Sequence, residues 1–103
     1  MRPISTLPLL LAVLLLAATI AGCAGAPVQE MSNARQAVRA AERAGAASHA
    51  PDTLNEARRL LKNAEYNLRH GDYRTARDDA EQARNKAVEA RRVAELAAVP
   101  VPP

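Results

Sequence analysis

The stretch YRTARDDAEQARNKAVEARRVAELAA, residues 73–98, decides the fold of this 103-residue chain. Along it, an initial tyrosine and then only alanines recur at alternating steps of three and four residues. The positions are Tyr73, Ala76, Ala80, Ala83, Ala87, Ala90, Ala94 and Ala97. A repeat that averages 3.5 residues indicates a helix that supercoils with a neighbour, so we expect a helix over about residues 72–98. Because nearly every position of this seam is alanine, the backbone of this helix must approach that of its neighbour closely. We expect it to form a tight antiparallel hairpin with the helix that precedes it.

A second heptad pattern precedes this stretch. Its seam positions are Leu54, Ala57, Leu61, Ala64 and Leu68. They predict a helix over residues 51–70, which Pro51 opens because a backbone N–H would have no intrahelical partner at that position. Gly71 is a stop signal, and Asp72 is a suitable N-cap for the next helix. A junction of two residues favours antiparallel packing of the helices that it joins.

The first helix of the folded region is expected over residues 28–44. Its buried face carries Met31, Ala34, Val38 and Ala41. Gly45 suits the position after a helix end, and residues 46–50 are expected to form a connector. Strand patterns are absent from the sequence. The predicted fold is therefore all-α: an Ala-rich antiparallel helical hairpin or three-helix bundle over residues 28–98, followed by an extended Pro-rich tail at 99–103.

Opposite charges recur on these helices at i,i+4 spacing. The pairs are Arg74 with Asp78, Arg77 with Glu81, Arg91 with Glu95, and Glu65 with Arg69. Ion pairs of this kind on an exposed helix contribute roughly a few tenths of a kcal/mol each. We expect them to be solvated pairs without a role in ligand binding.

An apolar run occupies residues 9–21, behind a single cation at Arg2. Its length of roughly 13 residues is short of the ~20 needed to cross the hydrocarbon core of a bilayer. A charged start, an apolar stretch and small residues at its end are typical of a cleaved secretory signal peptide. We therefore expect residues 1–22 to be removed, which leaves 81 residues with 13 Lys and Arg against 11 Asp and Glu.

The apolar run ends at Ile20-Ala21-Gly22-Cys23. This order of a branched apolar residue, two small residues and a cysteine resembles the lipobox of bacterial lipoproteins. The resemblance implies that Cys23 becomes the new N-terminus and carries fatty acyl chains such as palmitate, with residues 23–27 as a lipidated tether. Each buried CH₂ contributes roughly 0.8 kcal/mol, so several chains would hold the protein stably on a membrane. Because Ala24 rather than aspartate follows the cysteine, the resemblance favours the periplasmic face of the outer membrane.

Residues that carry catalytic or metal chemistry are sparse. His49 lies in the expected connector and His70 at a helix end, too far apart to share a metal, and an acylated Cys23 offers no thiol. The four glycines are scattered, so the sequence has no phosphate-binding loop. Neither a basic face nor stacking aromatic residues are indicated for nucleic acid. We expect no catalytic residue, no metal site, no cofactor, no small-molecule substrate and no nucleic-acid partner.

Five residues frame the junction before the last helix: Leu68, Gly71, Asp72, Tyr73 and Ala76. They resemble the helix–turn–helix joint of a tetratricopeptide repeat, in which glycine permits the turn, tyrosine packs across it and alanine permits close approach. Only one copy is present, and arrays of such repeats need about three copies to stack. The residues that resemble the repeat are also the ones that any tight hairpin of two helices requires. A tetratricopeptide-like adaptor that captures a peptide between its helices is an alternative function.

A wider pattern covers most of the chain behind the lipobox. It comprises Ala-Glu-Arg-Ala-Gly-Ala at 41–46, Ala50-Pro51, Gly71-Asp72-Tyr73 and, within the alanine-seamed helix, Glu81-Gln82-Ala83. Together with the lipobox, this pattern resembles the domain of unknown function 4398 family of bacterial lipoproteins. The resemblance implies an architecture but no known activity. The sequence departs from the family at His49, where tyrosine is frequent.

These patterns predict a non-enzymatic, lipid-anchored protein of the bacterial cell envelope that serves as a structural or protein-interaction module. The expected partners are the membrane, through the lipid on Cys23, and an unidentified envelope protein or a second copy of the chain. Self-association as a coiled coil would follow the murein lipoprotein, although Pro103 stands where that protein has its crosslinking lysine. Burial contributes about 25 cal/mol per Å² of apolar surface, so a core of small alanines gains little and favours help from a partner.

Overall fold

The computed structural model describes residues 6–22 and 25–100, which form five helices and no strand. The helices are α1 (Thr6–Gly22), α2 (Val28–Arg43), α3 (Ala46–His49), α4 (Pro51–Arg69) and α5 (Tyr73–Ala97). The predicted all-α class is confirmed. Helices α2, α4 and α5 begin and end within one residue of the ranges predicted for them.

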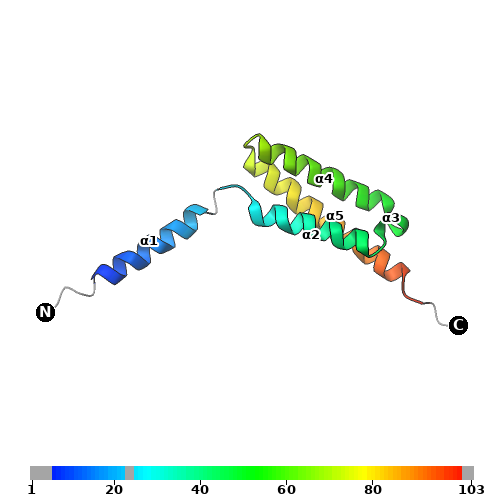
Figure 1. Cartoon of the computed structure of the whole chain (residues 1–103), viewed down its shortest axis with the longest axis horizontal. Helices are drawn as coiled ribbons and strands as arrows, with labels where there is room; N and C mark the ends of the chain where they lie inside the picture. Colours follow the sequence, from blue (N-terminus) through cyan, green and yellow to red (C-terminus); the bar gives the residue numbers. More distant parts are fainter. Residues whose placement is uncertain (1–5, 23–24, 101–103) are drawn as a thin grey trace.

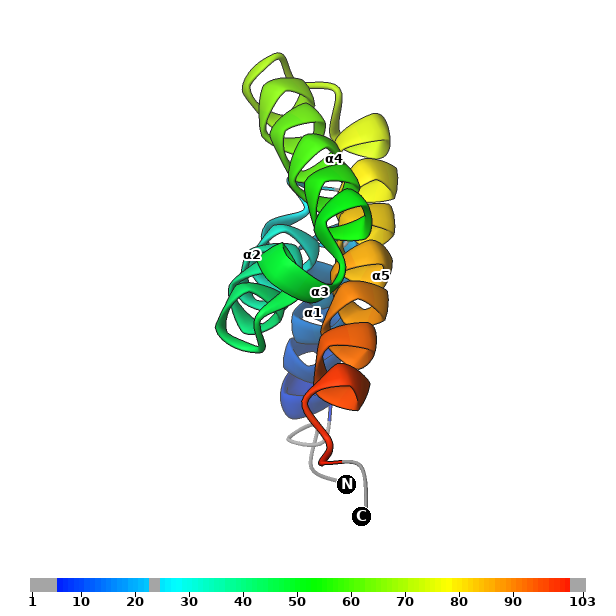
Figure 2. The same cartoon turned by 90° about the vertical axis from the view of Figure 1, so that its right-hand side faces the viewer.

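Helices α2, α4 and α5 form a bundle in which α5 packs against both α2 and α4 (Figure 1). Helix α4 runs antiparallel to α5, as the short junction between them requires. Figure 2 shows the same bundle turned by 90°, with α2 and α4 on one side of α5. Within the described ranges, α1 lies apart and contacts none of the other helices. The bundle therefore has a complete core without α1.

The core of the bundle is built mostly from alanine. On α5, the side chains with 0% exposure are Ala76, Ala80, Ala83, Ala87, Ala90 and Ala94. The two ends of the predicted seam are different, because Tyr73 is 41% exposed and Ala97 is exposed. All four residues predicted on the buried face of α2 are buried. Larger side chains are few, and Met31 and Leu54, followed by the smaller Pro27, are the largest that are almost fully enclosed.

The buried face of α4 differs from the predicted seam at Leu60, Leu61 and Leu68. Leu60 is buried, whereas Leu61 and Leu68 are only partly buried at the edge of the core. Helix α4 packs against α2 as well as α5. Its buried face is consequently wider than the single seam of a two-helix coiled coil, and it includes Leu60 beside the heptad positions.

The predicted connector at residues 46–50 contains a helical turn, α3, that the sequence pattern did not indicate. Its backbone closes with hydrogen bonds from His49 N to Gly45 O at 3.2 Å and from Ala50 N to Ala46 O at 2.8 Å. Ala46 has no exposed surface and belongs to the core. Burial of this alanine holds the connector against the bundle.

One of the four ion pairs predicted along single helices is present, and residues of two others pair with a neighbouring helix. Arg91 does contact Glu95, with 2.6 Å between Nε and Oε1. The structure instead joins Arg77 to Glu30, Arg35 to Glu65 and Arg58 to Glu42, each at about 3.5 Å. Arg74 and Asp78 make no ion pair within the described ranges. Long side chains at the flanks of a close-packed bundle reach the neighbouring helix as easily as the next turn of their own.

Candidate functional site

The cysteine predicted to carry lipid, Cys23, lies outside the described residues. The preceding lipobox residues Ile20, Ala21 and Gly22 form the end of α1. Of the helices described, none combines the length and the apolar character needed to cross a membrane. Lipidation at Cys23 therefore stays a prediction from the sequence.

The predicted junction residues close the turn between α4 and α5. The N–H of Gly71 donates to the Leu68 carbonyl at 3.2 Å, and the N–H of Asp72 donates to the Asn67 carbonyl at 2.9 Å. These two hydrogen bonds make a Schellman motif, in which Gly71 adopts a positive φ of 77°. The carboxylate of Asp72 then accepts the N–H of Thr75 at 3.3 Å and caps α5.

Side chains near this junction contact one another, and one hydrogen bond joins the two helices. The amide of Asn67 donates to the carboxylate of Asp79 across the two helices at 3.0 Å. The rings of Tyr66 and His70 stack with their centroids 4.0 Å apart. Ala76 is completely buried where α5 begins. These contacts give the junction a role in stabilising the fold.

Replacing Gly71 with alanine is expected to lower the free energy of unfolding by about 1–2 kcal/mol, because an L-residue with a side chain is strained in the left-handed region. A Cβ added there would meet no atom within 4 Å, so the loss comes from the backbone alone. Gly71→Asn is the matched control, since asparagine adopts this conformation more readily. Urea denaturation of both variants measures the effect, and equal losses would contradict the role given to Gly71.

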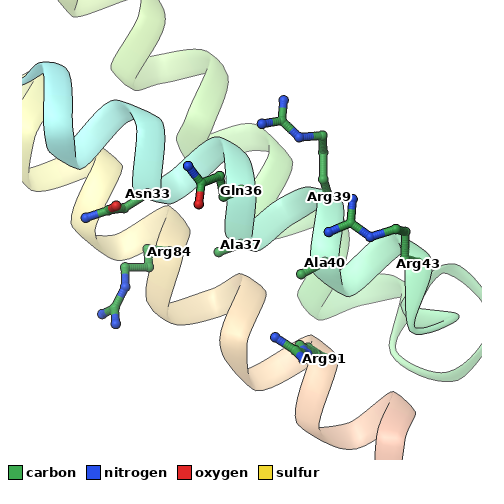
Figure 3. A pocket seen from close by; sticks show the side chains of 8 residues that line it. All are labelled: Asn33, Gln36, Ala37, Arg39, Ala40, Arg43, Arg84 and Arg91. Atoms are coloured by element: carbon green, nitrogen blue, oxygen red, sulfur yellow. The ribbon is translucent and has the colours of Figure 1, made fainter.

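An open groove lies between α2 and α5 (Figure 3). It has a volume of about 680 Å³. Six of its lining residues come from α2 and two from α5: Asn33, Gln36, Ala37, Arg39, Ala40, Arg43, Arg84 and Arg91. Four arginines and no carboxylate line it, so the groove is positively charged.

The charges of the groove are only partly compensated. Arg91 contacts Glu95 outside the lining through its Nε. Arg84 contacts the neutral amide of Asn85 at 3.5 Å. Within the described ranges, Arg39 and Arg43 have no carboxylate within 4 Å. Exposed guanidinium groups without a carboxylate partner are suited to binding carboxylates or phosphates, with which they form two parallel hydrogen bonds.

The sequence did not indicate a basic face, and that expectation is wrong for this groove. Two of its arginines are one helical turn apart on α2, and two are seven positions apart on α5. Neither helix is strongly basic by itself, because acidic residues are interspersed along both. Only the packing of α2 beside α5 places the four arginines around one groove. Their spacing of four and seven residues is the one signal that the sequence contains.

The residues considered for metal chemistry are not brought together. In the described ranges, no group of three or more His, Cys, Asp or Glu side chains is arranged to hold a metal ion. His70 stacks on Tyr66 at the junction, whereas His49 lies in α3.

The fold and the groove define a small all-α domain with an alanine-packed core and a basic surface groove. The family model described as "Domain of unknown function (DUF4398)" matches residues 29–99, which include nearly all of α2 to α5. The chain belongs to this family. No curated protein and no solved structure matches the chain.

Proposed function

We propose that this chain is a lipid-anchored, non-enzymatic module of the bacterial envelope that binds a partner protein through its helical bundle. The observation that carries the proposal is the position of the lipobox-like Ile20-Ala21-Gly22-Cys23 directly ahead of the bundle. Cys23 precedes the first residue of α2, Val28, by only five positions. A lipid on Cys23 would hold the bundle at the membrane surface through a tether that is too short to extend far.

A non-enzymatic role is supported by the nature of the interior. Every buried side chain in the described ranges is apolar, and none is charged or polar. Enzymes place groups with perturbed acidity in enclosed, partly buried sites. The polar groups of this bundle lie at its surface, where they suit recognition of another molecule.

An interaction role is supported by the small core and the basic groove. Alanine burial gains much less than leucine burial, at about 25 cal/mol per Å² of apolar surface. A partner that binds only the folded bundle would stabilise it by mass action. The arginine-lined groove between α2 and α5 provides a surface of distinct chemistry for such a partner.

The proposed location is the periplasmic face of the outer membrane, with acyl chains such as palmitate on Cys23. This part of the proposal rests on the resemblance to bacterial lipoproteins and on Ala24, which follows the cysteine. An Ala24→Asp variant supplies the corresponding test. Its redistribution to the inner membrane on a density gradient supports outer-membrane sorting, and an unchanged distribution contradicts it.

Replacing Cys23 with serine is expected to abolish lipidation, because the hydroxyl cannot form the thioether of a lipoprotein. The full chain is expressed in a bacterium that is fed an alkyne analogue of palmitate, and its mass is measured after purification. The native chain is expected to carry the label and to lack residues 1–22, whereas Cys23→Ser carries no label and retains them. Gly25→Ser, which keeps the cysteine, is the matched control. Incorporation of the palmitate analogue into the Cys23→Ser protein would contradict the proposal that Cys23 is the lipid anchor.

A further inference from the structure

We propose that the groove between α2 and α5 binds an acidic helical segment of a partner protein. This inference rests on the proposed function as a protein-interaction module and specifies its surface. The groove provides cations on both of its sides, a floor of small side chains and no competing carboxylate in its lining. These three features together define the chemistry of the occupant.

The arginines form two short rows with helical spacing. Arg39 and Arg43 are about 6 Å apart along the axis of α2, and Arg84 and Arg91 are about 10.5 Å apart along α5. On a third helix, carboxylates at positions i and i+4 are separated along the axis by the same distance as Arg39 and Arg43. Carboxylates at i and i+7 are separated by the same distance as Arg84 and Arg91. One helix placed in the groove can therefore oppose carboxylates to both rows. A single compact anion would reach only one or two of these guanidinium groups.

The floor of the groove allows a helix to approach closely. Ala37 and Ala40, both partly buried, are the small residues of its lining. Elsewhere in this bundle, alanine positions are the ones at which helix backbones pack together. At the other end of the lining, the side-chain amides of Asn33 and Gln36 provide further hydrogen-bond donors. A docked helix would find both contact area and polar partners.

Concavity favours a peptide over the membrane surface. A planar layer of lipid headgroups touches the rims of a groove and leaves its floor uncovered. Arginine recognises carboxylates through paired hydrogen bonds that need a defined approach, which a helix of fixed side-chain spacing supplies. The contact of Arg91 with Glu95 uses its Nε and leaves its terminal nitrogens for such a partner.

The test uses the chain from Ala24 onward, because the bundle has a complete core without α1. The probe is a fluorescent, alanine-based synthetic peptide whose glutamates follow i, i+4, i+7 along one stripe. A peptide of equal composition with its glutamates spread around the helix is the control probe. Fluorescence anisotropy is expected to show at least about tenfold tighter binding of the striped peptide, a difference of about 1.4 kcal/mol.

Variants of the groove locate the binding site. Arg39→Gln with Arg43→Gln is expected to weaken binding of the striped peptide about tenfold, as is Arg84→Gln with Arg91→Gln. Arg69→Gln with Arg74→Gln removes the same charge at the α4–α5 junction and is expected to leave the affinity within about twofold. Ala40→Glu, which adds a carboxylate to the floor, should abolish binding. Circular dichroism verifies that each variant is folded.

Several outcomes would overturn this assignment. Equal binding of the two peptides, or an equal loss in the Arg69 and Arg74 control, would mean that general charge and not the groove is responsible. Arginine-dependent sedimentation with anionic phospholipid vesicles, without preference for the striped peptide, would assign the cations to a membrane surface. The bundle used in these experiments lacks Cys23, so their failure leaves the anchor intact, and failure of palmitate labelling leaves the groove intact.

Discussion

Truncating Leu54 to alanine is expected to lower the free energy of unfolding of the bundle by about 2–5 kcal/mol. Leu54 has 0% exposure and fills the core where α3, α4 and α5 meet. Few other large side chains surround it, and alanines cannot move in to refill the space. A loss of this size is a large share of the roughly 5–15 kcal/mol that small domains possess.

Urea denaturation followed by far-UV circular dichroism measures this loss. Leu96→Ala is the matched control, because Leu96 lies on the same bundle with 68% of its surface exposed. Its effect is expected to stay within about 0.5 kcal/mol. If both variants shifted the midpoint equally, Leu54 would not belong to a packed core.

Enlarging Ala87 to leucine is the second change with a large expected effect. Ala87 is completely buried in the middle of α5, and the core around it includes residues of α2 and α4. Because Ala87 has no exposed surface, three added carbons would press on the neighbouring residues and are expected to move the helices apart. Overpacking of this kind costs about 1–3 kcal/mol, and the upper end is expected where backbones are close.

Thermal unfolding of Ala87→Leu should show a lowered midpoint relative to the native chain. Ala97→Leu, at the exposed end of the same helix, receives the same side chain and should unfold near the native temperature. A native-like midpoint for Ala87→Leu would show that the seam has spare volume, in conflict with the close approach of helices described above.

The repeating patterns predicted most of the fold because they act locally and are repeated many times. Each alanine of the α5 seam reinforces the same helical face, and Gly71 with Asp72 specifies a turn through its own hydrogen bonds. Predictions were weaker where a third element intervened. Leu60 is buried because α2 widens the contact face of α4, and no heptad along α4 alone carries that information.

The candidate site was less predictable than the fold for the same reason. Arg39 and Arg84 are 45 positions apart in the sequence and line the same groove only through packing of their helices. The ion pair of Arg77 with Glu30 likewise depends on tertiary structure, and i,i+4 spacing along one helix cannot predict it. Helix α3 was missed because its four residues are too few to display a period. Lipidation of Cys23, in contrast, is indicated by the sequence and lies outside the described structure.

The alanine core has a consequence for the entropy of the bundle. Alanine has no rotatable side-chain torsion, so its burial costs essentially no side-chain conformational entropy, whereas buried methionine or leucine loses rotamer freedom. The modest gain from burying small side chains is thus offset in part by a small entropic loss. The buried alanines therefore have no alternative side-chain conformation to adopt, and only a few larger core residues do. A binding partner would meet a helical frame of nearly fixed shape, on which long surface side chains such as the arginines of the groove are free to adjust.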